Sequence, residues 1–144
     1  MERIASPKST YLLEAGLEVL HQQSNEWRSE IAFWRDEVAF FYALVVRKTG
    51  KEVPVNSKSS IELIEAELIK ITGGELDELQ QEVDLHEYFL SHMLQARKED
   101  QLDYREKHKQ MAAKFDQFEK RFKALKMEIF KVVESLKKSL IIPQ

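Results

Sequence analysis

The chain has 144 residues, of which 43% are hydrophobic and 33% charged, and its formal net charge is −3 at pH 7. This length and apolar content suit a single domain over residues 1–144 and argue against a disordered chain. The absence of cysteine excludes disulfides, thiolate metal sites and a cysteine nucleophile, and it fits a cytoplasmic protein. Only four glycines and three prolines are present, which is typical of long helices. No window of about 18 residues lacks charge, so neither a signal peptide nor a membrane-spanning helix is predicted.

The first predicted helix covers residues 9–49 and begins near the capping candidates Ser9 and Thr10. Its apolar residues recur at alternating steps of four and three, which is the heptad spacing of a helix that packs along other helices. Ser24 is the polar interruption of this seam. The apolar members are Leu13, Leu17, Leu20, Trp27, Ile31, Trp34, Val38, Phe41 and Val45.

The second predicted helix covers residues 59–96, and its seam contains one irregular step. The members are Ile61, Ile64, Leu68, Ile71, Leu76, Leu79, Val83, His86, Leu90 and Met93. The step from Ile71 to Leu76 is five residues long and contains Gly73-Gly74. Either one long helix carries a local bulge there, or the chain breaks into two short helices and forms a four-helix bundle. We favour the continuous helix, because two short helices would leave much of the first seam uncovered.

The third predicted helix covers residues 101–139 and continues the same heptad spacing. Its apolar members are Met111, Phe115, Phe118, Phe122, Leu125, Ile129, Val132 and Leu136, and His108 occupies the next position back. Three long helices with short connections pack antiparallel. The sequence therefore predicts an all-α, up-down-up three-helix bundle.

His21, Trp27 and Glu37 on the first helix form a spaced pattern. In this respect the chain resembles helical proteins of unassigned function from bacterial genomes, which have a similar His-x5-Trp segment followed by a glutamate. Some of those proteins carry a further histidine where this chain has Ser24. The resemblance implies a long helical bundle over most of the chain and brings no activity with it.

Three histidines are predicted to lie at one height of the bundle. His86 and His108 stand at similar distances from the turn between the second and third helices, and His21 stands at a similar height on the first. Neutral imidazoles from three helices could hold zinc or another divalent ion, completed by a carboxylate or water, and an open position could activate water. The alternative is that a histidine in a heptad seam fixes the register or makes a buried hydrogen bond. We favour this alternative slightly.

Two glutamates of the first helix, Glu30 and Glu37, have aromatic neighbours. A carboxylate among aromatic rings needs a partner or a proton. Neither glutamate is followed by a histidine three residues later, which argues against the carboxylate-bridged di-iron bundles. We expect each to lie at the edge of a helix interface and to pair with a lysine or arginine of the third helix.

Aromatic and methionine side chains also lie off the seams, at Phe33, Phe40, Met127 and Phe130. Either each helix buries a wide face, or a second stripe contacts another copy or a partner helix, and we favour homodimerisation. Residues 98–138 carry net positive charge, but the acidic helices beside them oppose binding of nucleic acid.

The chain lacks a phosphate-binding loop, a nucleophile elbow, a His-Glu-x2-His motif and a recognisable catalytic triad. We therefore expect a non-enzymatic, soluble helical bundle that acts as a protein-interaction or structural module. The alternative is a metal-binding bundle that uses His21, His86 and His108. No other cofactor is indicated, and neither a membrane nor a nucleic acid is an expected partner.

Overall fold

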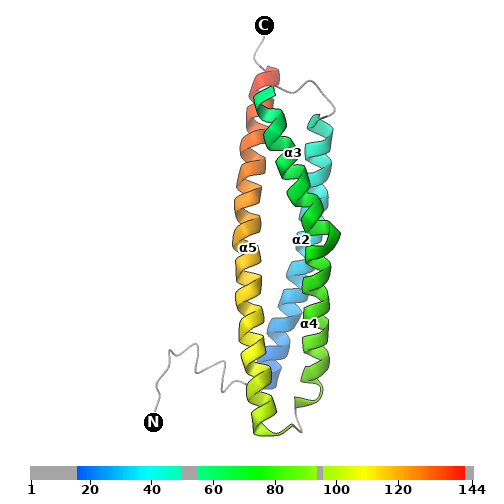
Figure 1. Ribbon diagram of the computed structural model, residues 1–144, viewed down its shortest axis with the longest axis vertical. Helices are drawn as coiled ribbons and strands as arrows, with labels where there is room; N and C mark the ends of the chain where they lie inside the picture. Colours follow the sequence, from blue (N-terminus) through cyan, green and yellow to red (C-terminus); the bar gives the residue numbers. More distant parts are fainter. Residues whose placement is uncertain (1–15, 50–54, 94–95, 142–144) are drawn as a thin grey trace, which may run out of the picture. The chain divides into compact units, whose positions relative to one another are not determined.

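The computed structural model describes residues 16–49, 55–93 and 96–141 (Figure 1). In chain order the elements are α2 (Leu17–Thr49), α3 (Val55–Lys70), the π-helical turn η1 (Ile71–Glu75), α4 (Leu76–Leu90) and α5 (Lys98–Ile141). No strand occurs within the described ranges. The predicted all-α fold is therefore confirmed.

The second helix of the prediction corresponds to α3, η1 and α4, which follow one another without a loop (Figure 1). In η1 the backbone N–H of Leu76 donates to the carbonyl of Ile71, an i to i+5 bond that inserts one extra residue into the helix. Because of this insertion, Ile71 and Leu76 are both buried although they stand five residues apart. The predicted bulge is confirmed, and the four-helix alternative with a break at Gly73-Gly74 is wrong.

The predicted helix ends shift by a few residues. The second helix begins at Val55 rather than residue 59, and α4 ends at Leu90, where the predicted helix extended to residue 96. α5 begins at Lys98 rather than residue 101, since Glu99 and Asp100 supply negative charge to its first turn. The predicted start of the first helix near Ser9 lies outside the described residues.

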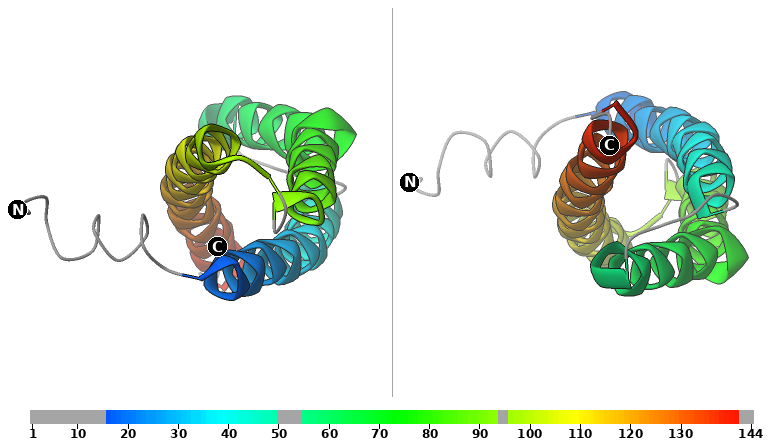
Figure 2. Two further views of the ribbon diagram at one scale, coloured as in Figure 1. Left: turned by 90° about the horizontal axis from the view of Figure 1, so that it is seen from below. Right: turned by 90° about the horizontal axis from the view of Figure 1, so that it is seen from above.

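Contacts divide the chain into two compact units. The first unit comprises Met1–Ile31 and Leu79–Gln117, and the second comprises Ala32–Glu78 and Phe118–Gln144. The first unit contains the start of α2, most of α4 and the start of α5, and these segments surround a common centre in the end-on views (Figure 2). The second unit contains the rest of α2 and of α5 together with α3 and η1.

Ion pairs join neighbouring helices within each unit. In the first unit Arg28 of α2 pairs with Asp84, and Lys114 of α5 pairs with Glu82. In the second unit the pairs are Arg35 with Asp77, Arg121 with Glu75 and Lys126 with Glu37. In the first unit His21 also meets Glu87 and His86 also meets His108, so residue numbers on α2 and α5 rise together while those on α4 fall. The first unit thus has the predicted up-down-up arrangement. In the second unit α2 and α5 run in the same direction, because Trp34 meets Phe118 and Phe41 meets Phe130.

The core consists largely of the predicted seams. Buried seam residues are Leu20, Trp27, Ile31, Trp34, Val38, Phe41, Val45, Ile61, Ile64, Leu68, Ile71, Leu76, Leu79, Val83, Met111, Phe115, Phe118, Phe122, Ile129 and Leu136. Ser24, His86 and His108 are buried among them as polar members. Within the described ranges, no helix combines the length and apolarity needed to cross a membrane.

Candidate functional site: a buried histidine pair and its groove

His86 and His108 meet in the core of the first unit. His86 is 5% exposed and His108 is 2% exposed, and Nε2 of His86 lies 2.9 Å from Nδ1 of His108. On its other side, Nε2 of His108 lies 2.7 Å from Oε1 of Gln23. Because the amide oxygen can only accept, Nε2 of His108 donates to Gln23, and Nδ1 of a neutral His108 accepts from Nε2–H of His86. The three side chains therefore form one directed hydrogen-bond chain across three helices.

Aromatic rings enclose this chain. The phenol of Tyr104 stacks on the His86 ring with centroids 4.2 Å apart, and the indole of Trp27 lies 4.6 Å from the His108 ring. Trp27 in turn stacks on Phe115 at 5.0 Å. The rings exclude water from the imidazoles, so the protonated forms lose hydration that the protein does not replace.

Burial keeps both histidines neutral. Desolvation lowers the pKa of His86 from 6.5 to about 4, with a further contribution from the positive charge of Lys107. Desolvation likewise lowers the pKa of His108 to about 4, and repulsion by His86 and Arg105 adds to it. The phenol of Tyr104 has a raised pKa for the same main reason, burial. All three groups are uncharged at neutral pH.

His21 does not contact the pair formed by His86 and His108. Its Nδ1 pairs with the carboxylate of Glu87 at 2.8 Å, and its side chain is half-exposed. Its Nε2 lies 3.2 Å from the side-chain amide nitrogen of Asn25. Two of the three histidines in the predicted layer are therefore neighbours, whereas the third makes its own polar contacts at the surface.

The histidine pair has the geometry of a hydrogen bond rather than of a shared metal ion. Two nitrogens on one tetrahedral zinc, each about 2.0–2.1 Å from it, lie about 3.3 Å apart, and an ion would have to replace the proton between them. Across the described ranges, no group of three or more histidine, aspartate or glutamate side chains is placed to hold a metal ion. Of the three predicted ligands, His86 and His108 are in contact, whereas His21 is turned toward Glu87.

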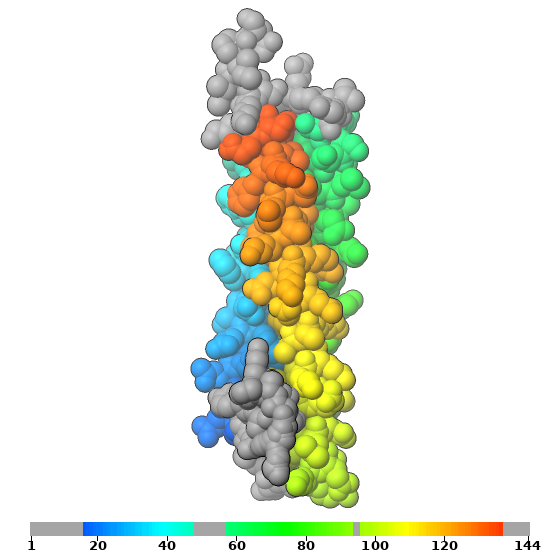
Figure 3. Space-filling view, turned by 90° about the vertical axis from the view of Figure 1, so that its left-hand side faces the viewer, coloured from blue at the N-terminus to red at the C-terminus, as the bar shows by residue number. Residues whose placement is uncertain are grey.

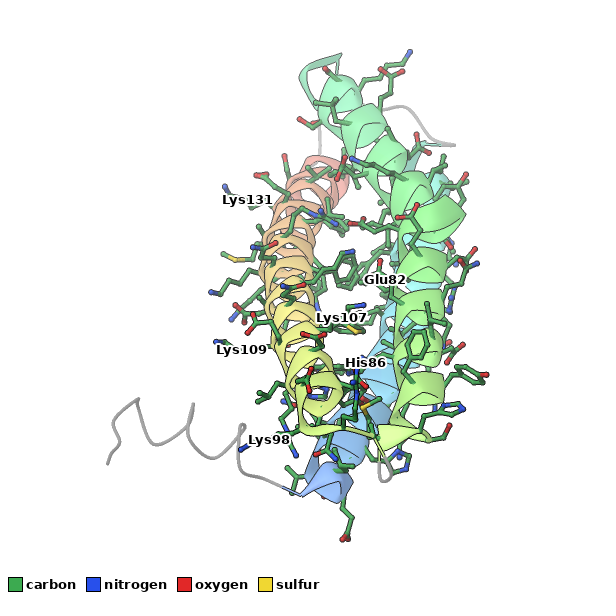
Figure 4. The ribbon with its side chains drawn as sticks, turned by 60° about the horizontal axis from the view of Figure 1, so that its bottom comes forward. Glu82, His86, Lys98, Lys107, Lys109 and Lys131 are labelled. Carbon is green, nitrogen blue, oxygen red and sulfur yellow. The ribbon has the colours of Figure 1, made fainter. Side chains whose placement is uncertain are left out.

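A groove of about 290 Å³ opens between α4 and α5 beside the pair. Its lining residues are Glu82, Leu85, His86, Phe89, Lys107, Gln110, Met111 and Lys114. In Figure 4 Lys107 extends from α5 toward α4, whereas Lys109 of the same helix points away. The buried hydrogen-bond chain thus ends at His86, on the wall of a surface groove.

The second unit contains the pairing expected for Glu37. Its Oε2 accepts a hydrogen bond from the ammonium of Lys126 on α5 at 3.0 Å, and its Oε1 is buried without a partner among the described residues. The expectation of a basic partner from the third helix is confirmed for Glu37.

The off-seam apolar residues of the second unit remain at the surface. Phe33, Phe40, Met127 and Phe130 are 54% to 64% exposed. Phe40 and Phe130 both contact the buried ring of Phe41, edge-on, at centroid distances of 5.3 and 5.6 Å. The four side chains, hereafter the aromatic stripe, belong to the adjoining α2 and α5 surfaces, which are cyan and orange in Figure 3.

Comparison with known proteins identifies no relative: no protein-family model, curated protein or solved structure matches the chain. Function must therefore be argued from the residues themselves.

Sequence reasoning missed Tyr104, Gln23 and the groove. Tyr104 stands four residues before His108, so one more backward step of the third ladder would have placed it in the core. No comparable signal marks Gln23, because a polar residue beside the seam gains significance only when its side chain meets a buried partner.

Proposed function

We propose that this protein is a non-enzymatic, cytoplasmic helical interaction module that associates with a second copy of itself through the aromatic stripe. The observation that carries the proposal is the exposure of the stripe: Phe33, Phe40, Met127 and Phe130 each leave more than half of their surface in water. A cluster of exposed aromatic side chains is more typical of an interface than of a free monomer surface.

The position of the stripe supports this reading. Phe33 and Phe40 stand four residues before and three residues after Glu37, on one face of α2. Glu37 is tied to Lys126 of α5, which directly precedes Met127. The apolar residues therefore flank an ion pair that would become more deeply buried when a second molecule covers it, and this would favour one docking register.

The size of the stripe sets the expected affinity. Each of its side chains exposes about 100 Å², so the four together offer on the order of 400 Å² of apolar surface. This lies below the roughly 800 Å² that each partner contributes to a standard interface. We therefore expect a weak dimer that dissociates in the micromolar range.

Sedimentation equilibrium from about 1 to 200 micromolar protein tests the proposal. A mass rising from 17.0 kDa toward twice that value is expected for the wild type. Phe40→Ser should shift the transition to at least tenfold higher concentration. Leu63→Ser is the matched control, because Leu63 is 68% exposed on α3 and lies outside the stripe. A wild type that stays monomeric throughout, or equal effects of both substitutions, would refute self-association through this surface.

The alternative function, metal binding by His21, His86 and His108, has weaker support. One observation favours it: two neutral imidazoles already meet in the first unit, although an ion would have to replace the proton between them and His21 would have to leave Glu87. Calorimetric titration of the metal-free protein with zinc is the test. Binding that disappears in His108→Ala, but persists in His92→Ala, would favour the metal site over the interaction module.

A further inference from the structure

We propose that the groove between α4 and α5 binds a small aliphatic monocarboxylate, with the carboxylate at Lys107 and the chain along the apolar lining. The groove belongs entirely to the first unit and is separate from the aromatic stripe. This small-molecule site goes beyond the proposed function, because it does not depend on self-association.

The lining provides space for an aliphatic chain. Leu85 and Phe89 come from α4 and are 56% and 42% exposed, and Met111 of α5 forms a buried part of the wall. The lining extends from Glu82 to Phe89 and from Lys107 to Lys114, about 10 Å along each helix axis. The volume of about 290 Å³ corresponds to about ten water molecules. Such a ligand would cover apolar side chains that now contact water.

The charged side chains that line the groove indicate that its ligand has an anionic head group. Lys114 is neutralised by Glu82, whose carboxylate oxygens lie 2.7 and 2.9 Å from its ammonium. Lys107 is exposed and makes no ion pair with any residue in the described ranges. With His86 neutral, the lining therefore carries one uncompensated positive charge. A single carboxylate would match it, and the apolar lining around it would strengthen the attraction relative to open water.

His86 makes the groove a built site rather than a gap between helices. Its ring is 5% exposed and forms part of the wall, held by Tyr104 stacked on it and by the bond from Nε2 to His108. Its Nδ1 has no hydrogen-bond partner among the described residues. Because the proton of the neutral ring is on Nε2, Nδ1 can only accept a hydrogen bond, so the carboxylate of the ligand lies at Lys107 and its chain lies against the rigid imidazole.

The test is a titration with octanoate, followed by nuclear magnetic resonance of the imidazole rings and methionine methyls. The chain has only four histidines and four methionines, so their signals can be assigned by single substitutions. The His86 ring and the Met111 methyl should shift in a saturable way, whereas the exposed ring of His92 should not. No saturable shift at His86, or equal shifts at His86 and His92, would overturn the proposal.

Two comparisons test the role assigned to Lys107. Lys107→Gln should weaken octanoate binding about tenfold, the loss of one charge-assisted contact. Lys109→Gln is the matched control, since Lys109 is exposed on the same helix and does not line the groove. 1-Octanol, which has the chain without the charge, should bind at least tenfold more weakly than octanoate. Equal effects of both substitutions, or equal binding of the alcohol, would overturn the assignment.

The variant Phe40→Ser, which is designed to weaken self-association, shows whether octanoate binding is independent of the proposed function. Phe40→Ser should bind octanoate as the wild type does, because Phe40 belongs to the second unit and the groove to the first. Loss of octanoate binding in Phe40→Ser would count against the groove as the site.

Discussion

Nε2 of His86 lies 2.9 Å from Nδ1 of His108, in a part of the core that lowers the pKa of both rings to about 4. The native state therefore remains neutral at this pair down to a pH at which exposed histidines are protonated. The contact joins α4 to α5, and the further bond to Gln23 joins α5 to α2. Three polar residues thus connect all three helices of the first unit.

This pair predicts a stability that falls in mild acid. Between pH 6.5 and 4 the unfolded chain binds protons at both positions and the native state does not, so acid favours unfolding. Each histidine can lower the free energy of unfolding by up to about 1.4 kcal/mol per pH unit in this window. Above pH 7 the two histidines contribute no pH dependence. Urea denaturation from pH 4 to 8 measures the effect.

The control for the acid effect replaces the titrating rings. The double variant His86→Gln, His108→Gln should lose most of the slope between pH 4 and 6.5, whereas His92→Gln should keep it, because His92 is exposed. If the double variant shows the wild-type slope, the acid sensitivity comes from other groups.

Lys126 is predicted to stabilise the second unit chiefly by satisfying Glu37. Both side chains are largely buried, and one carboxylate oxygen already lacks a partner among the described residues. Lys126→Met would leave the carboxylate without its cation and should cost about 1–3 kcal/mol of unfolding free energy. The double variant Glu37→Leu, Lys126→Met should be more stable than Lys126→Met alone. Thermal and urea denaturation of the wild type, Glu37→Leu, Lys126→Met and the double variant complete the cycle.

The exposed pair Arg35–Asp77 provides the comparison for that cycle. Its side chains are 36% and 57% exposed, so we expect a coupling below about 0.5 kcal/mol. Equal coupling in the two cycles would contradict the role given to burial of Glu37.

Replacing the glycines of η1 should stabilise the protein. A Cβ at Gly73 or Gly74 would meet no atom within 4 Å, and neither glycine has a backbone conformation that disfavours alanine. Gly73→Ala and Gly74→Ala should each raise the unfolding free energy by about 0.5–1 kcal/mol, because alanine loses less backbone entropy on folding. Gly16→Ala should give no such gain, since Gly16 directly precedes α2, where alanine is a poor cap. A loss of stability at both positions of η1 would show that the π-helical turn itself requires glycine.

Tyr104 is predicted to contribute through its ring rather than its hydroxyl. The ring stacks on His86, but the hydroxyl is buried without a partner among the described residues. Tyr104→Phe should therefore leave the unfolding free energy unchanged or raise it by about 1 kcal/mol, whereas Tyr104→Ala should lower it by about 3–5 kcal/mol. Tyr88→Phe, at an exposed position, should change nothing. A marked loss in Tyr104→Phe would indicate that an internal water binds the hydroxyl.

Much of the fold could be predicted because burial along a helix leaves a periodic trace. The five-residue step between Ile71 and Leu76 predicts that the helix contains one inserted residue. The structure accommodates this residue in a π-helical turn with one i to i+5 hydrogen bond. Helix ends were less predictable, as at Leu90, where neither glycine nor proline follows to mark the end of the helix.

The candidate site was predictable only in part. The ladders placed His86 and His108 in the seams at similar heights, and that alone predicts that they meet. Whether His21 joins them depends on the rotation of α2 about its axis, which turns His21 toward Glu87 and Gln23 toward His108. A helix position can change partner with a few tens of degrees of rotation, and sequence spacing does not specify that angle.

The sequence by itself determined the helical class, the seams, the inserted residue and the presence of buried histidines, because these follow from periodicity and side-chain polarity along one chain. Tertiary structure alone decided which imidazole nitrogen meets which partner, and that Lys107 lacks an ion pair within the described ranges. It also decided that the groove opens beside His86. Those features depend on distances of a few ångström between helices, and the packing of many side chains together sets such distances.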